Sequence, residues 1–469
     1  MRPVYDDAYE RQELINLGFN NPQRQFERFY DNPISFTSQY YFCPVPLRLD
    51  TYSGCAFNCC YCFANNSNQK YMNNTKKKAG DFVDKEVIPT RYSNIKKYFD
   101  VAFNGKKNTF KNQEAIAIQC LQKRVPLHFG GMSDPLQALE KDIAITYMTL
   151  KLLKKYQYPV ILSSKSNLLL DKRYIDLIKD YDNFALQISL IDDRNEVINL
   201  LEPNASNVEE RLSVIKEYSN MGKWVGVRIQ PFIINLSESR IISLLDKIKA
   251  TGAKHVMVEG LKFFSGNKDA NKKISSLISK FNNTNFDMSK YYKAIGAVHS
   301  GNDLELPSKI KSSYVNVFKN EIKKRGMTFG AADNDLRTEG DSPCCCGVEN
   351  LKGFENLIKH NTGFAIFDAI RNNKKSFTYD DIKDYWFPEG KFRVVKSNEE
   401  LKKKFGENST YKDAEVDIKE AFLKAWNKGL KNSPCDVCCI KKINKNFIIS
   451  ENKKEEKITK QTFLDDYYG

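Results

Sequence analysis

The sequence contains no long hydrophobic run, no signal-peptide core and no low-complexity tract. No stretch approaches the roughly 18 consecutive apolar residues that a membrane-spanning helix needs. Residues 1–31 are charged and aromatic, unlike a secretion signal. With 469 residues, 41% of them hydrophobic and 28% charged, the composition is that of a globular protein of two or three domains. We therefore expect a soluble, cytoplasmic protein that makes no contact with a membrane.

Isolated cysteines are scarce, because ten of the twelve lie in three tight groups. The groups are Cys55, Cys59, Cys60 and Cys62; Cys344, Cys345 and Cys346; and Cys435, Cys438 and Cys439. Only Cys43 and Cys120 stand alone, and Cys120 is expected in the core. In a chain without a secretion signal, grouped cysteines favour metal ligands over disulfides.

Positive charge is in excess and is concentrated in two stretches. The chain has 73 Lys and Arg against 58 Asp and Glu, a net charge of +15. Residues 70–112 contribute +7 and residues 262–325 contribute +8, so the remainder is balanced. In both stretches aromatic residues lie among the basic ones, as in Lys96-Lys97-Tyr98-Phe99. This pattern is typical of surfaces that bind single-stranded nucleic acid, although two solvated helical faces would also produce it.

Short strands alternate with amphipathic helices from residue 46 to residue 263, which predicts an α/β fold with a parallel sheet. The expected strands are Pro46–Tyr52, Val125–Gly130, Pro159–Ser164, Phe184–Ile191, Val225–Phe232 and His255–Leu261. The expected helices include Leu139–Lys155, Asp171–Tyr181, Val208–Met221 and Glu238–Ala250. Six such units predict a partial (βα)6 TIM-like barrel over 46–263, preceded by an extension over 1–45. A basic helical insertion over 264–330 and a cysteine-containing C-terminal domain over 331–469 would follow.

The strongest signal is the C-x3-C-x2-C spacing of Cys55, Cys59 and Cys62, directly after the first expected strand. In βα barrels, the loops that follow the strands carry the functional residues. Three thiolates at this spacing fit one face of an iron–sulfur cube and leave one iron open to a small molecule. Cys60 is then a spare thiol. A zinc site is the alternative, but zinc sites usually have four protein ligands in C-x2-C pairs.

This loop resembles the signature of the radical S-adenosylmethionine superfamily, C-x3-C-x-aromatic-C, with Tyr61 as the aromatic residue. The resemblance implies a 4Fe–4S cluster on Cys55, Cys59 and Cys62, with S-adenosylmethionine on the open iron. It also implies reductive cleavage of S-adenosylmethionine to a 5′-deoxyadenosyl radical, which abstracts a hydrogen from a substrate. An electron donor such as flavodoxin or ferredoxin would be needed, and Tyr61 would lie near the adenine.

Further segments resemble the spore photoproduct lyase-like, or DNA repair photolyase, branch of this superfamily. They include Gly131-Met-Ser-Asp134-Pro135, Ser164-Lys165-Ser166, Gln187-Ile-Ser189, Glu202-Pro203, Val227-Arg228 and Val258-Glu259-Gly260, in the family's order. By this resemblance, Ser133, Lys165 and Ser189 are candidate contacts of S-adenosylmethionine. Arg228 would serve cofactor or substrate, or form an ion pair with Glu202 or Glu259. Met132 stands where the lyases carry a hydrogen-donating cysteine, so dimer reversal by their route is not expected.

The second and third cysteine groups both contain Ser-Pro-Cys and are expected to form one site. One or two of Cys344, Cys345 and Cys346 would ligate a metal together with Cys435 and either Cys438 or Cys439. An auxiliary 4Fe–4S cluster and a structural zinc are the two alternatives. Radical enzymes of other branches often carry auxiliary clusters in C-terminal extensions, which favours the first by resemblance.

Three hypotheses for the function follow. The first is a radical enzyme that acts on a base or sugar of DNA or RNA, in repair or modification, and the two basic stretches favour it. The second is a radical enzyme that matures a peptide or protein with the help of the auxiliary cluster. The third is a non-enzymatic iron–sulfur binding or sensor protein, which the open-iron triad and the loops around Lys165 and Ser189 disfavour.

Overall fold

The computed structural model describes most of the chain. The described residues are 1–37, 43–64, 87–264, 266–300, 303–393, 398–410, 412–428, 440–444 and 446–449. The third cysteine group, Cys435, Cys438 and Cys439, lies outside them, as does part of the first basic stretch. Within the described residues, no helix has the length and apolar character needed to cross a bilayer.

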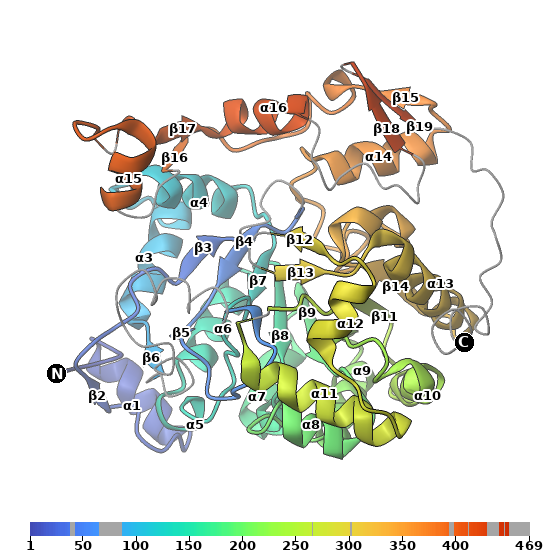
Figure 1. Cartoon of the computed structure of the whole chain (residues 1–469). Coiled ribbons are helices and arrows are strands. Elements are labelled where there is room, and N and C mark those ends of the chain that lie inside the picture. Colours follow the sequence, from blue (N-terminus) through green and yellow to red (C-terminus); the bar gives the residue numbers. More distant parts are fainter. Residues whose placement is uncertain are drawn as a thin grey trace.

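An eight-stranded sheet forms the centre of the protein (Figure 1). Its strands are β3 (Ile34–Phe36), β4 (Leu47–Leu49), β7 (Leu127–Phe129), β8 (Val160–Ser164), β9 (Phe184–Ser189), β10 (Trp224–Phe232), β11 (His255–Gly260) and β14 (Thr328–Ala331). Their order across the sheet is β14-β11-β10-β9-β8-β7-β4-β3. β3 is antiparallel to β4, and every other neighbouring pair is parallel. The α/β prediction is therefore confirmed, and strands at all six expected positions lie side by side in chain order.

Helices alternate with the strands, as the sequence predicts. They include α3 (Tyr92–Phe103), α4 (Asn112–Gln122), α5 (Glu140–Ile143), α6 (Ile145–Lys155), α7 (Lys172–Lys179), α8 (Asn195–Leu201), α9 (Val208–Asn220) and α10 (Ile241–Ala250). α9 begins with a capping box, in which the side chains of Asn207 and Glu210 each accept a hydrogen bond from the other's backbone N–H. The helix expected over 139–155 is divided into α5 and α6, because Ala144 adopts a φ of 55°.

The two faces of the sheet differ in character, because successive side chains of a strand point to opposite sides. On one face, residues such as Val225, Val227 and Ile229 pack in the main core with the helices. The other face is called the inner face below. It carries Arg48, His128, Ile161, Ser163, Ala185, Gln187, Trp224 and Arg228. Near the amino-terminal ends of the strands, Cys344, Cys346, Val348 and Phe354 share a second core with Ile161 and Ala185 of this face.

The region 264–330 is not wholly helical, contrary to the expectation. It contains α11 (Lys268–Asn282), α12 (Met288–Ala294) and α13 (Ser308–Lys324), but also the hairpin of β12 (Val298–Ser300) and β13 (Asp303–Glu305). β14 then pairs with β11 and extends the sheet across the expected boundary at residue 330. The four residues of β14, Thr-Phe-Gly-Ala, are too few and too rich in small residues to show a strand pattern.

The remaining elements lie outside the large sheet. They are β1 (Arg2–Pro3), α1 (Ala8–Asn16), β2 (Gln25–Phe26), β5 (Tyr52–Ser53), β6 (Ile88–Pro89), α14 (Thr362–Arg371), β15 (Ser376–Phe377), β16 (Lys391–Arg393), α15 (Asn398–Phe405), β17 (Glu415–Asp417), α16 (Ile418–Lys428), β18 (Ile440–Ile443) and β19 (Asn446–Ile449). β15, β19 and β18 form a three-stranded sheet beside α14, apart from the large sheet (Figure 1). Ile366, Phe377, Trp426 and Phe447 pack there in a separate small core.

Candidate functional site

The first cysteine group lies on a loop at the carboxyl end of β4. The loop begins after β5, which pairs with β6, and it turns at Gly54 with a φ of 86°. The amide of Gln137 holds its start, accepting from Ala56 N at 2.8 Å and donating to the Gly54 carbonyl at 3.3 Å. At its other end, Cys60 N donates to the carbonyl of Leu201 at 2.9 Å. The loop is thus fixed to the segments that follow β7 and β9.

Three thiols of this loop interact with one another. Cys59 is buried and lies within electrostatic range of Cys55 and Cys62. Burial raises the pKa of Cys55 to about 12, and the carboxylate of Asp134 adds to this effect. A buried thiolate at this place therefore requires positive charge beside it, which a bound iron–sulfur cluster would provide. The chemistry of these three side chains fits such a cluster.

Cys60 is separated from these three thiols. It packs in the main core, its carbonyl accepts from Asn267 Nδ2 at 2.8 Å, and its charged neighbours include Lys273 and Asp269 of α11. Within the part of the chain that the structure describes, no three His, Cys, Asp or Glu side chains are grouped as ligands of a single metal ion. In an iron–sulfur cube, by contrast, each thiolate binds a different iron atom. The assignment of Cys55, Cys59 and Cys62 as ligands stays a prediction.

Glu202 connects the cysteine loop with the ends of the strands. Its carboxylate is fully buried, lies 2.5 Å from the guanidinium of Arg211 and accepts a hydrogen bond from the hydroxyl of Tyr61. Lys165 Nζ lies 3.9 Å from the same carboxylate. Burial lowers the pKa of Lys165, but the nearby Cys59 and Glu202 outweigh it, so the pKa is raised overall. Glu202 thus holds Tyr61, Lys165 and Arg211 in one network beside Cys59.

The two candidate serines differ in their surroundings. The Ser133 hydroxyl donates to the carbonyl of Tyr52 at 2.7 Å. Its proton is therefore engaged in this bond, and its oxygen can still accept a hydrogen bond from a ligand. Ser189 is buried at the end of β9, and its carbonyl accepts from Arg211 Nη1 at 2.9 Å. The structure brings Ser189 close to the Glu202 network through Arg211, and it brings Ser133 close to the start of the cysteine loop through Tyr52.

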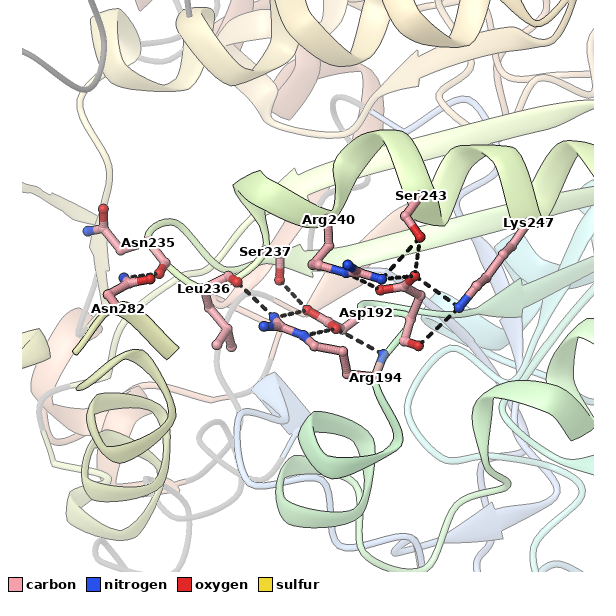
Figure 2. Close-up of polar contacts among 10 residues, drawn as sticks. Asp192, Arg194, Asn235, Leu236, Ser237, Arg240, Ser243, Lys247 and Asn282 are labelled. Carbon is pink, nitrogen blue, oxygen red and sulfur yellow. Dashed lines mark hydrogen bonds and ion pairs between the residues drawn. The ribbon is translucent and has the colours of Figure 1, made fainter. Parts of the chain in front are cut away.

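The loop after β9 is anchored by a cluster of ion pairs (Figure 2). Asp192 accepts from the guanidinium of Arg194 and from Ser237 Oγ at 2.9 Å. Asp193 binds Arg240, Ser243 and Lys247 of the segment that leads into and forms α10. Burial raises the pKa of Asp193, but these donors reverse the effect and hold it well below its usual range. The cluster fixes the segment that carries α8 and Glu202, so it supports the cysteine loop indirectly.

Arg228 does not form the ion pair suggested from the sequence. Its guanidinium donates to His128 Nε2 at 3.1 Å, to Ser163 Oγ at 3.0 Å and to Gln230 Oε1 at 3.0 Å. Glu202 is paired with Arg211 instead. Glu259 accepts from the Gln230 amide and pairs with Lys262 at 3.1 Å. The reason is geometric: Arg228 lies on the inner face, where neutral side chains of β7, β8 and β10 surround it.

The second cysteine group lies on the inner face, near the amino-terminal ends of the strands. The thiols of Cys344, Cys345 and Cys346 lie within electrostatic range of one another. His255 Nε2 lies 2.8 Å from the Cys345 carbonyl, and a Cβ at Gly330 would lie 2.2 Å from the same oxygen. Because Cys435, Cys438 and Cys439 lie outside the described residues, the joint site stays a prediction.

Sequence analysis missed Cys43 as a member of this group. Cys43 packs against the second core beside Val45, and its charge would interact with Cys344, Cys345 and Cys346. No spacing pattern could have revealed it, because the strands of the large sheet lie between the two segments in sequence. Cys120, in contrast, is fully buried in the main core, as expected.

The aromatic residues of the basic stretches are mostly core residues, which corrects the stacking interpretation. Tyr92, Tyr98, Phe99 and Tyr292 are all buried. Each lies on the apolar side of a helix, so its ring packs inward and cannot stack on a base. Lys96 pairs with Glu10, Lys106 with Asp100 and Lys280 with Glu196. Lys97 and Lys107 are among the lysines of these stretches that are exposed and form no ion pair with a described residue.

Comparisons with known proteins give similarity of structure only. No family model matches the sequence, and no curated protein sequence matches it. A spore photoproduct lyase variant is 13% identical to this chain. The match covers 65% of this chain and 79% of the lyase, with a TM-score of 0.41. Another, with bound AdoMet and dinucleoside spore photoproduct, has 13% identity, the same coverage and a TM-score of 0.40.

A radical S-adenosylmethionine methyltransferase, TsrM from Kitasatospora setae with cobalamin and a [4Fe-4S] cluster, is also similar. It is 12% identical, and the match covers 55% of this chain and 42% of TsrM, with a TM-score of 0.32. At these identities and TM-scores, the similarities do not assign a function.

Proposed function

We propose that the protein is a radical S-adenosylmethionine enzyme whose cluster is bound by Cys55, Cys59 and Cys62, at the open end of a partial (βα)6 barrel. The observation that carries the proposal is the arrangement of four neighbouring thiols on one loop. Three of them interact with one another, and Cys59 also interacts with Lys165, while Cys60 turns into the core. This is the separation that a three-ligand cluster with one spare cysteine requires.

The protein's own residues would bind and orient S-adenosylmethionine. When bound, the cluster supplies the electron for reductive cleavage of the sulfonium. Lys165 would bind the methionyl carboxylate. Its ammonium lies 3.9 Å from Glu202 and has N–H groups that can donate to a second carboxylate. The Ser133 oxygen and the Ser189 hydroxyl would contact the ribose or the carboxylate. Tyr61 would lie beside the adenine, with its ring direction fixed by the bond to Glu202.

Cleavage of S-adenosylmethionine tests this proposal. Anaerobically reconstituted protein with dithionite should release 5′-deoxyadenosine, measured by chromatography. Cys55→Ala, Cys59→Ala and Cys62→Ala should each reduce the product to background. Cys60→Ala is the matched control, because it removes a thiol from the same loop, and it should retain most of the activity. Loss in the Cys60→Ala variant with retention in the Cys59→Ala variant would contradict the ligand assignment.

We also propose an auxiliary metal centre built from one or two of Cys344, Cys345 and Cys346 with Cys435 and either Cys438 or Cys439. The packing of Cys43 against the same group supports its addition as a ligand. Two 4Fe–4S clusters predict about eight irons per chain, falling to about four in a Cys344→Ala/Cys346→Ala variant. Retention of about one zinc and four irons would instead support the structural zinc.

We propose a nucleic-acid base or sugar as the substrate. The exposed Lys97 and Lys107 support it, since both lie within a stretch that carries a net charge of +7. A peptide-maturing enzyme is the alternative, and it predicts no salt-dependent binding of an oligonucleotide. A non-enzymatic sensor would bind the cluster without releasing 5′-deoxyadenosine.

A further inference from the structure

Two arginines of the inner face flank a neutral histidine. Arg48 on β4 is in register with His128 on β7, and Arg228 on β10 reaches the same imidazole. Burial and the positive charges of Arg228 and Arg48 lower the pKa of His128 to about 3. His128 is therefore uncharged at neutral pH, and its Nε2 lies 3.1 Å from Arg228 Nη1 and 2.8 Å from Ser163 Oγ. The centre of the inner face thus carries two positive charges that His128 does not offset.

Neither guanidinium forms an ion pair with a carboxylate among the described residues. Arg228 donates only to neutral groups. Arg48 Nη2 donates to Ser35 Oγ at 3.3 Å and to the Phe36 carbonyl at 2.9 Å, while its buried Nε has no described acceptor. Asp50 is buried within electrostatic range of Arg48 but forms no ion pair with it, and its Oδ1 accepts from the backbone N–H groups of Met132 and Ser133. Asp50 therefore offsets part of the charge of Arg48, while the contacts of Arg228 are all neutral.

Gln187 provides a third donor on the same face. Its side chain is only 1% exposed, and its Oε1 accepts from Ser163 Oγ at 3.1 Å. No described residue accepts a hydrogen bond from its buried Nε2. A buried donor without a partner is destabilising, and a bound acceptor would remove that cost. The unpaired amide and the two guanidiniums would therefore bind the same kind of ligand, one that is anionic and rich in acceptor atoms.

We propose that the inner face binds a phosphoryl group of the substrate between Arg48 and Arg228, with the Gln187 amide as an additional donor. The proposal deepens the nucleic-acid function proposed above and rests on it for the identity of the substrate. A phosphodiester of DNA or RNA carries one negative charge and a terminal phosphate monoester about −1.5 to −2 near pH 7, so either supplies an anionic group for the guanidiniums. Arginine also presents paired N–H groups that fit phosphoryl oxygens.

Gly131 gives Arg48 the space to take this position. A Cβ at Gly131 would lie 2.7 Å from Arg48 Cδ, so only glycine lets the arginine pass below the loop that follows β7. The same loop carries Ser133, whose hydroxyl bonds to Tyr52 at the start of the cysteine loop. A phosphoryl group on Arg48 would therefore lie below the loop that borders the proposed S-adenosylmethionine site.

Calorimetric titration of the purified full chain tests the phosphoryl site. Thymidine 5′-monophosphate is the probe, and we expect saturation at or below about 1 mM at physiological salt. Arg48→Gln and Arg228→Gln should each weaken binding at least tenfold. Arg24→Gln is the control, because Arg24 is exposed and pairs with Asp142 at 3.2 Å, and it should bind like the wild type. Arg48→Lys and Arg228→Lys keep the charge and should lose less, which provides a second readout if a glutamine variant fails to fold.

Further probes identify the source of the phosphoryl group. Competition by inorganic phosphate would show that the phosphoryl group is recognised alone, whereas failure to compete would show that the nucleoside is also required. Thymidine binding as tightly as its monophosphate, succinate binding more tightly, or binding unaffected by both Arg→Gln changes would overturn the proposal. The Cys59→Ala variant separates the two proposals, because it should lose 5′-deoxyadenosine release and still bind the nucleotide.

Discussion

The substitution Glu202→Gln tests whether the buried network behind the cysteine loop acts as an ionic unit. Glu202 and Arg211 are both fully buried, and their charged atoms lie 2.5 Å apart. Glutamine has nearly the same shape and can still accept from the Tyr61 hydroxyl. The change therefore removes one charge and leaves the guanidinium of Arg211 in the interior without its counter-ion.

The magnitude follows from the burial of both partners. Removing one member of a buried ion pair costs about 3–5 kcal/mol, because the remaining charge stays desolvated. We expect the lower end, about 3 kcal/mol, since Arg211 keeps its hydrogen bonds to the carbonyls of Ser206 and Ser189. For a cooperative unit of about 150–250 residues, each kcal/mol shifts Tm by roughly 2–4 °C, so Tm should fall by roughly 6–12 °C.

Thermal unfolding followed by circular dichroism measures this effect. The double variant Glu202→Gln/Arg211→Met should be less destabilised than the sum of the two single variants, by at least about 1.5 kcal/mol, because neither member of the Glu202–Arg211 pair is left charged without the other. Lys172→Gln is the exposed control: its side chain is 84% accessible and pairs with Asp176 at 2.9 Å, so Tm should change by less than about 2 °C. A Glu202→Gln variant within 2 °C of wild type, or strict additivity in the double variant, would refute the ionic interpretation.

Two further predictions concern pH and salt. Burial raises the pKa of Glu140 to about 7, above its unfolded value, so its contribution to stability is present at low pH and is lost as pH rises through 7. The free energy of unfolding of the wild type should therefore fall between pH 5 and pH 8, and Glu140→Gln should make this fall smaller by up to about 3 kcal/mol. Urea titration at both pH values measures the difference. Lys97→Glu with Lys107→Glu should weaken oligonucleotide binding and reduce the slope of log K against log salt by about 2, measured by fluorescence anisotropy.

A specific result would contradict each of these predictions. An unchanged pH dependence in Glu140→Gln would show that the carboxyl does not titrate in this range, despite its bonds from Tyr52 and Tyr174. For the lysines, Lys172→Glu is the control, since it reverses an exposed charge outside the two basic stretches. Equal losses of binding in the control and in the double variant would show that only the net charge matters. They would contradict a binding surface near Lys97.

The elements of the sheet could be predicted wherever hydrophobic pattern and length agreed. β8 and β9 are buried along their whole length, so their apolar runs are visible in the sequence. β14 could not be predicted, because its strand character comes from pairing with β11 and from the close approach of Cys345 to Gly330. Tertiary contacts, rather than local preference, determine such a strand.

The candidate site could be predicted only in its local part. The spacing of Cys55, Cys59 and Cys62 is a property of one loop, and the structure keeps their thiols together. The partners of Arg228 could not be predicted, because pairing depends on strand register and on which face each side chain occupies. For the same reason, the roles of Arg211 and Cys43 became apparent only when distant segments were brought together.

The distribution of compensated and uncompensated charge indicates where a ligand belongs. Lys165 and Arg211 share the single carboxylate of Glu202, so one positive charge remains there for the carboxylate of a ligand. Arg228 donates only to neutral groups among the described residues, and Arg48 has Asp50 within electrostatic range but forms no ion pair with it. A partly buried cation without a counter-ion is costly, so an anion bound beside Arg228 and His128 would stabilise the fold. The inner face below the loop at Gly131 is therefore one place where a bound anion would stabilise this protein.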